Sequence, residues 1–167
     1  MMDNEPNLIE NEEFQDVGSF NHSCLQTNVS TLLKNTGKYT VCIELSLDLS
    51  NLDLSQFDLK AKEELKPDIC IYPKRKINPT HDILKMSEMP LLAIEILSPK
   101  QGTYDILEKF KAYFELGIQS CWLVIPSNLS ITVYSNIDNF KNFVNDLSDE
   151  IIDSVLDIRL PIQDIFE

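Results

Sequence analysis

Two carboxylates stand where the strand patterns call for hydrophobic residues. Asp68 follows Pro67 at the start of one apolar run, and Glu95 lies inside another, over residues 91–97. Burying an ionised carboxylate is very unfavourable unless it is paired, hydrogen-bonded or metal-bound. Two such groups on adjacent strands would repel each other, and a divalent cation between them would remove the repulsion. The pair therefore predicts a site for Mg²⁺ or Mn²⁺, which could activate water for phosphodiester cleavage.

A lysine could complete such a site. Lys109 lies on a predicted helix over residues 103–116, one turn after Asp105, and a nearby lysine can stabilise a developing anion or position the water. The same residues also fit a purely structural arrangement. Glu95 could form a buried ion pair with Lys109, and Asp105 with Lys109 fits an ordinary i,i+4 helix pair. The residue chemistry leaves both interpretations open.

Three further residues are assigned structural roles. His22 lies on a predicted N-terminal helix and is interpreted as a surface or capping residue rather than a ligand or base. Trp122 and Tyr113 have aliphatic neighbours, and we interpret both as core residues rather than stacking platforms.

Hydrophobic spacing predicts the elements that position these residues. A helix is expected over residues 23–34, capped by Asn21 or Ser23, and the helix over 103–116 should expose Glu108 and end at Gly117. The run 91–97 is apolar on both faces, as in a central strand. The other expected elements are a hairpin at 7–17, strands at 41–49, 67–73, 121–125 and 130–134, short helices near 81–86 and 140–147 (the latter a helix or loop), strands near 151 and 158, and a turn at 161–166.

Composition and charge set the class of protein. With 167 residues and 43% hydrophobic content, we expect one mixed α/β domain over residues 1–167, with 1–6 frayed. The net charge of -13 disfavours tight nonspecific binding to nucleic acid, and the basic cluster at residues 74–76 is interpreted as a solvated loop. Four widely spaced cysteines, no signal peptide and no membrane-spanning run predict a reduced, cytoplasmic protein.

The order of these motifs resembles a known family. A Pro-Asp pair, Leu-Ala-Ile-Glu-Ile-Leu-Ser-Pro over 92–99, Asp105 with Lys109, then Tyr113, Gly117, the Trp-Leu-Val of 122–124 and Pro126 resemble the Uma-two family, within the PD-(D/E)xK nuclease superfamily. The resemblance implies a restriction-endonuclease-like fold, with a central mixed sheet flanked by helices and an N-terminal hairpin. It also implies a Mg-dependent endonuclease in which Asp68 and Glu95 bind the metal, Lys109 replaces a lysine that the superfamily has at position 97, and Asp105 supports Lys109 or the metal shell.

Some positions depart from the family pattern. Asn7 and Asn11 stand where members often carry Glu and Gly, position 97 is Leu, and Ile125 replaces a frequent Asp. These departures and the acidic balance favour the alternative, a catalytically inactive nuclease-fold interaction module. The intact set of Asp68, Glu95 and Lys109 favours the nuclease. A positive rim formed by Lys74, Arg75, Lys76, Lys100 and Lys109 would support activity, and a homodimer is expected by analogy with nucleases of this fold.

Overall fold

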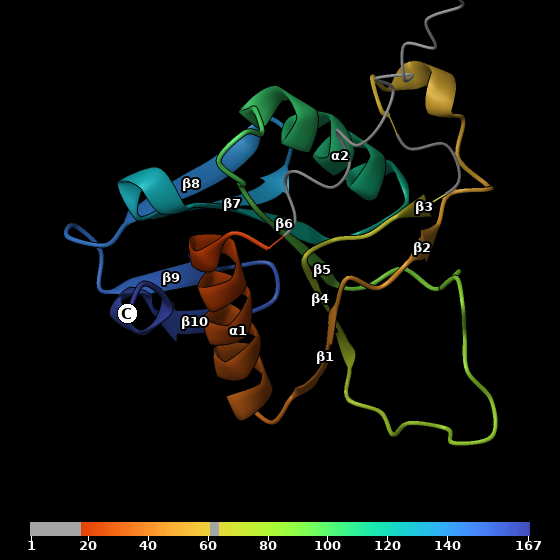
Figure 1. Cartoon of the computed structure of the whole chain (residues 1–167), viewed down its shortest axis with the longest axis horizontal. Coiled ribbons are helices and arrows are strands. Elements are labelled where there is room, and N and C mark those ends of the chain that lie inside the picture. Colours follow the sequence, from red (N-terminus) through yellow and green to blue (C-terminus); the bar gives the residue numbers. More distant parts are fainter. Residues whose placement is uncertain (1–17, 61–63) are drawn as a thin grey trace, which may run out of the picture.

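A six-stranded mixed sheet forms the centre of the protein (Figure 1). The structure, a computed structural model, describes residues 18–60 and 64–167. The order is β1-β4-β5-β6-β7-β8, in which β5 and β6 are parallel and the other neighbours antiparallel. The strands are β1 (Tyr39–Ile43), β4 (Ile69–Pro73), β5 (Leu92–Ile96), β6 (Ser120–Ile125), β7 (Ser130–Asn136) and β8 (Asn139–Val144). The predicted hairpin at 7–17 lies outside the described residues.

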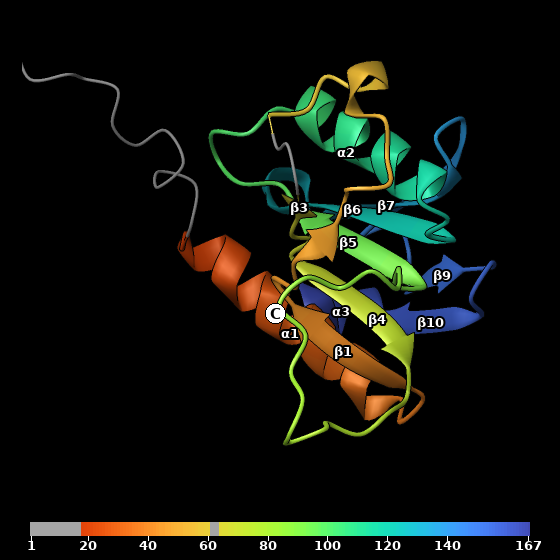
Figure 2. The same cartoon turned by 90° about the vertical axis from the view of Figure 1, so that its right-hand side faces the viewer.

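Helices and small sheets cover the two faces of this sheet (Figure 2). One face carries α1 (Phe20–Asn35), α3 (Ile162–Ile165) and the pair β9 (Glu150–Asp153) and β10 (Ile158–Pro161). The other carries α2 (Thr103–Glu115) and the segment with β2 (Leu47–Asp48), η1 (Leu54–Gln56) and β3 (Glu64–Leu65); η2 (Pro126–Asn128) links β6 to β7. The predicted α/β fold, a mixed sheet flanked by helices, is confirmed.

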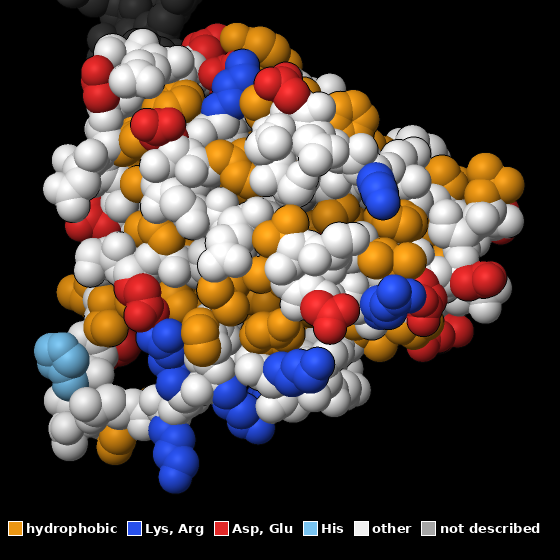
Figure 3. All heavy atoms as spheres, turned by 180° about the vertical axis from the view of Figure 1, so that it is seen from behind, with side chains coloured by type: hydrophobic (Ala, Val, Ile, Leu, Met, Phe, Trp, Pro, Cys, Tyr) orange, Lys and Arg blue, Asp and Glu red, His pale blue; other side chains and the backbone are white. Residues whose placement is uncertain are grey.

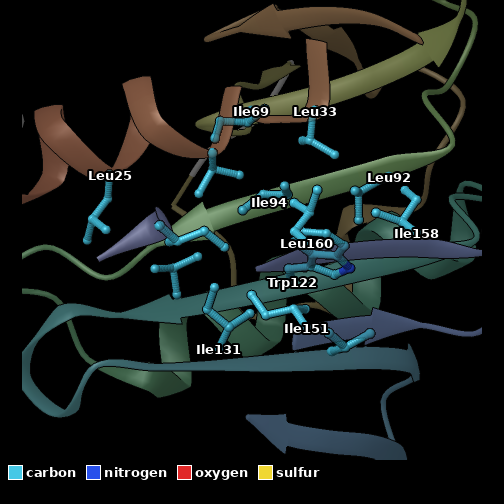
Figure 4. Close-up of a cluster of buried hydrophobic side chains, with 14 of the residues drawn as sticks. Leu25, Leu33, Ile69, Leu92, Ile94, Trp122, Ile131, Ile151, Ile158 and Leu160 are labelled. Carbon is cyan, nitrogen blue, oxygen red and sulfur yellow. The ribbon is translucent and has the colours of Figure 1, made fainter. Parts of the chain in front are cut away.

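Strand alternation divides the core into two clusters. All five residues of β5 are buried, as expected for a central strand. Ile94 packs in the cluster on the α1 face, together with Trp122 and Leu160 (Figure 4), whereas Ala93 packs on the α2 face. Because side chains alternate along a strand, Glu95 points to the α2 face, where Lys109 and Tyr113 also lie.

The strand predicted over 41–49 is interrupted at Glu44. β1 pairs with β4 in the central sheet, but β2 pairs with β3 in a separate one. Glu44 has φ of 52°, and its N–H donates to the carbonyls of Pro67 and Asp68 at 3.2 and 3.3 Å. This left-handed residue ends the pairing with β4 and redirects the chain across the sheet, which the regular alternation of the sequence did not indicate.

Four other predictions are corrected. Residues 81–86 are not helical, because Met86 pairs instead with the β2 segment. The N–H of Met86 donates to the carbonyl of Ser46, and the carbonyl of Met86 accepts from the N–H of Asp48. Residues 139–144 form β8 on the edge of the sheet. The turn expected at 161–166 includes the short helix α3. The first helix begins at Phe20 and is capped by Ser19, whose hydroxyl accepts from the N–H of His22 at 3.3 Å, rather than by Asn21 or Ser23.

Glu108 was expected to face solvent on α2 but is 5% exposed. The segment before β3 lies against it, and its carboxylate accepts from the N–H of Asp58 at 3.1 Å and pairs with Lys111 at 2.6 Å. The hydrogen bond and ion pair with Lys111, followed by the bond from Asp58, lower the pKa of Glu108. All four cysteines are free thiols. No helix within 18–60 and 64–167 has the length and apolarity needed to cross a bilayer.

Candidate active site

A cavity of about 270 Å³ opens where β4 begins and β5 ends. The antiparallel pairing of these strands places Ile69 opposite Ile94, which brings Asp68 beside the end of β5. The acidic side chains lining the cavity are Glu44, Asp68 and Glu95, and the basic ones are His22, Lys66 and Lys109. Three of the four predicted site residues, Asp68, Glu95 and Lys109, therefore meet in one place.

Asp68 is fixed by contacts from two neighbouring elements. Its Oδ2 accepts the backbone N–H of Ile96 at 2.6 Å and lies 3.1 Å from Nε2 of His22. Its carbonyl accepts from Gln26 on α1 at 2.8 Å. The side chain is 16% exposed, so the carboxylate is held in a set direction while one side remains open to the cavity.

Glu95 is almost fully buried, at 3% exposure. The Tyr113 hydroxyl donates to its Oε1 at 2.8 Å, and Nζ of Lys109 lies 3.9 Å from the same oxygen. Burial raises the pKa of Glu95 to about 8, and the Asp68 carboxylate adds to the rise, while Lys109 and Tyr113 oppose it. Burial thus favours the protonated form of Glu95, whereas Lys109 and Tyr113 favour the carboxylate.

His22 lies in the cavity rather than at the surface, so its predicted role was wrong. Its side chain is 14% exposed, and the hydrogen bond to Asp68 raises its pKa. The contact joins the first turn of α1 to the start of β4, two segments far apart in sequence. One local signal pointed to it: His22 and Gln26 are spaced i,i+4 on one helix face, and both contact Asp68.

Asp105 does not line the cavity. It is half-buried near the start of α2, and the ion pair described for Lys109 is with Glu95. The buried pair considered from sequence is thus present, and a role for Asp105 stays a prediction.

The expected positive rim is not formed. Of the five cations proposed for it, Lys109 lines the cavity, and Lys66 joins it instead. Lys74, Arg75 and Lys76 follow the opposite end of β4 as exposed residues, as predicted for a solvated loop. Arg75 pairs with Glu88 and stacks on Tyr72 there. In Figure 3, Lys and Arg side chains gather toward the lower edge, where this segment lies.

The donor set fits a loosely held divalent cation. Within the described parts of the chain, no group of three or more His, Cys, Asp or Glu side chains is arranged to hold a metal ion. Asp68 and Glu95 nevertheless converge on the cavity, and their carboxylates interact closely enough to shift the pKa of Glu95. Mg²⁺ commonly binds through one or two carboxylates and keeps several waters, which matches two carboxylates beside an open cavity.

A central mixed sheet with helices on its faces and two carboxylates at adjacent strand ends defines a restriction-endonuclease-like fold. The sequence matches the model of the Uma2 family, described as "Putative restriction endonuclease", over residues 7–157, and the chain belongs to this family. The resemblance identified from the motifs is thereby confirmed.

A solved structure is similar to this chain in fold. The crystal structure of "a putative nuclease belonging to DUF820" from Anabaena variabilis ATCC 29413 aligns with a TM-score of 0.66 and 20% identity. The alignment covers 89% of this chain and 82% of that one, and at this identity it shows the fold alone. A search of curated proteins gives no match.

Proposed function

We propose that this protein is a nuclease that hydrolyses phosphodiester bonds of nucleic acid with Mg²⁺ or Mn²⁺. The observation that carries the proposal is the meeting of Asp68, Glu95 and Lys109 in one cavity. The descriptions of the family and of the Anabaena structure as nucleases support it.

Asp68 and Glu95 would hold the metal. A bound divalent ion supplies a Lewis acid for the phosphate and an activated water. The N–H of Ile96 orients Asp68, and the Tyr113 hydroxyl orients Glu95. These two hydrogen bonds hold the carboxylates in place, which reduces the reorganisation that binding would require.

Lys109 would act on the substrate. Its side chain is 27% exposed and lines the cavity, so its ammonium group can reach both Glu95 and a phosphate in the opening. There it would donate to the oxygen on which negative charge develops. Asp105 would orient Lys109 from the preceding helical turn.

Isothermal titration calorimetry with Mg²⁺ and Mn²⁺ tests the metal site. We expect wild type to bind and Asp68→Asn to lose binding, because the amide keeps an acceptor for Ile96 but lacks the charge. Glu150→Gln is a matched control, since Glu150 is half-exposed on β9 and pairs with Arg159. Asp105→Asn should bind the metal as wild type does, because Asp105 does not line the cavity, and weaker binding would assign Asp105 to the metal shell.

Hydrolysis is then measured on plasmid DNA and on single-stranded RNA, with Lys109→Ala as the variant. If the wild type binds metal but cleaves neither substrate, the metal site stands and the nuclease is rejected. Equal cleavage by wild type and Lys109→Ala would reject the role of Lys109. The absence of binding at millimolar metal would reject the metal site and assign structural roles to both carboxylates.

A second candidate function is the catalytically inactive interaction module. The placement of Lys74, Arg75 and Lys76 away from the cavity favours it, as does the net charge of -13, because both reduce attraction for phosphates. The hydrolysis assay separates the two candidates.

A further inference from the structure

Cys42 and Cys70 face each other across two neighbouring strands. They are direct register partners in the antiparallel β1–β4 pair, so their side chains lie on the same face of the sheet. Opposed residues in antiparallel strands have Cα atoms about 4.5–5.5 Å apart. This spacing lies within the range of about 4.4–6.8 Å that a disulfide spans.

We propose that Cys42 and Cys70 form a site of reversible oxidation, in which a hydroperoxide converts the two thiols to a disulfide. The inference is independent of the proposed nuclease activity. It rests on the register of the two cysteines, the face of the sheet that they share and the unequal exposure of their side chains.

Exposure assigns the roles of the two cysteines. Cys42 is half-buried on β1, the edge strand of the central sheet, whereas Cys70 is fully buried on β4. An oxidant can therefore reach Cys42 first. The hydrogen bond from Cys70, and the nearby Arg75 cation, lower the pKa of the Cys42 thiol, and the thiolate is the reactive form.

The reaction balances in two steps. The Cys42 thiolate attacks one peroxide oxygen, the O–O bond breaks, and the other oxygen leaves as water or an alcohol after taking up a proton. Cys42 is then a sulfenic acid. The Cys70 sulfur attacks the Cys42 sulfur, the S–O bond breaks, and a second water leaves with the Cys70 proton. The two sulfurs have together lost two electrons to the peroxide.

The chain contains its own comparators. Cys24 is half-buried like Cys42, but it lies on helix α1 and so has no partner cysteine across a strand pair. Cys121 is buried like Cys70, but its register partner is Ala93. Reactivity governed by exposure alone would select Cys24 as readily as Cys42, whereas reactivity governed by pairing would select Cys42 and Cys70.

Peptide mapping after treatment with hydrogen peroxide tests the proposal. The four cysteines lie on four different tryptic peptides, so a linked pair is identified by mass. We expect one linked species that joins the peptides of Cys42 and Cys70, with loss of two hydrogens and of both thiols from alkylation. Dithiothreitol should restore both thiols.

Single variants identify the steps. Cys70→Ser should stop at a sulfenic acid on Cys42 that dimedone captures, and Cys42→Ser should leave Cys70 unoxidised. Circular dichroism verifies that each variant is folded, and the wild-type mapping decides the question if one is not. Oxidation of Cys24 at the same rate as Cys42, or Cys42 over-oxidised without a link to Cys70, would overturn the proposal.

Discussion

At the scale of single residues, Tyr113 lies nearer to Glu95 than Lys109 does. Its hydroxyl lies 2.8 Å from the carboxylate, compared with 3.9 Å for Lys109. The sequence predicted Tyr113 as a core residue, and its side chain is indeed fully buried. Its polar role could not be foreseen, because the ring belongs to the α2 core while the hydroxyl reaches a residue on β5.

Replacing Glu95 by Gln should change how stability depends on pH. The folded protein raises the pKa of Glu95 from 4.5 to about 8, so between these values the folded state holds a proton that the unfolded state releases. The free energy of unfolding therefore falls as pH rises through this window. At about 1.4 kcal/mol per pH unit, the loss is on the order of 3 kcal/mol from pH 5 to pH 8, and Glu95→Gln should avoid it.

Urea denaturation at pH 5, 6.5 and 8 measures this effect. The Glu95→Gln variant should keep a shallower dependence of unfolding free energy on pH, which comes from His22. Its hydrogen bond to Asp68 raises the pKa of His22 in the folded state, so the stability it contributes is lost as pH rises through that pKa. Glu150→Gln, at a half-exposed carboxylate, should keep the wild-type slope. An unchanged slope in Glu95→Gln would show that Glu95 is not the proton-binding group.

At the scale of elements, local patterns predicted some segments well and others poorly. The helix expected over 103–116 is α2 (Thr103–Glu115), and the central strand over 91–97 is β5, since both follow from the periodicity of their own residues. The break at Glu44 depends instead on carbonyls at the start of β4. The non-helical 81–86 segment likewise depends on pairing with β2. Contacts between distant segments override local preference in both cases.

The C-terminal end of α2 should depend on a glycine. Gly117 has φ of 95°, and its N–H donates to Phe114 while that of Ile118 donates to Tyr113. Gly117→Ala should cost about 1 kcal/mol of unfolding free energy, because an L side chain disfavours this conformation. The control is Gly102→Ala, since Gly102 has φ of -89° and open space around it. Equal stability of the two variants by urea denaturation would contradict this account.

At the scale of the whole molecule, the basic loop at residues 74–76 lies away from the cavity. The net charge is -13, and the lysines that line the cavity within the described residues are Lys66 and Lys109. The sequence predicted the acidic pair because carboxylates stand out in apolar strand patterns, and it predicted Lys109 because the family resemblance implies a lysine on the following helix. The local signal for His22 was its i,i+4 spacing with Gln26, whereas Lys66 lies in a loop setting that looks ordinary until the chain is folded.

Lys66 and Lys74 should differ in their effect on nucleic-acid binding, a prediction that rests on the proposed function. Lys66 lines the cavity, and Lys74 is exposed beyond the other end of β4. Lys66→Ala should weaken binding of a short oligonucleotide and lower its salt slope by about 1. Lys74→Ala should leave the slope unchanged. Fluorescence anisotropy at several salt concentrations measures both, and a larger loss for Lys74→Ala would place the contact on the loop.

Trp122 gives the protein a built-in optical reporter. It is the single tryptophan of the chain, is fully buried on β6, and donates from Nε1 to the buried Asp153 carboxylate on β9 at 2.8 Å. Its emission will therefore follow the junction between the central sheet and the β9–β10 pair. Because the indole lies on the α1 face and Glu95 on the α2 face, intrinsic fluorescence can monitor global unfolding with little interference from changes at Glu95.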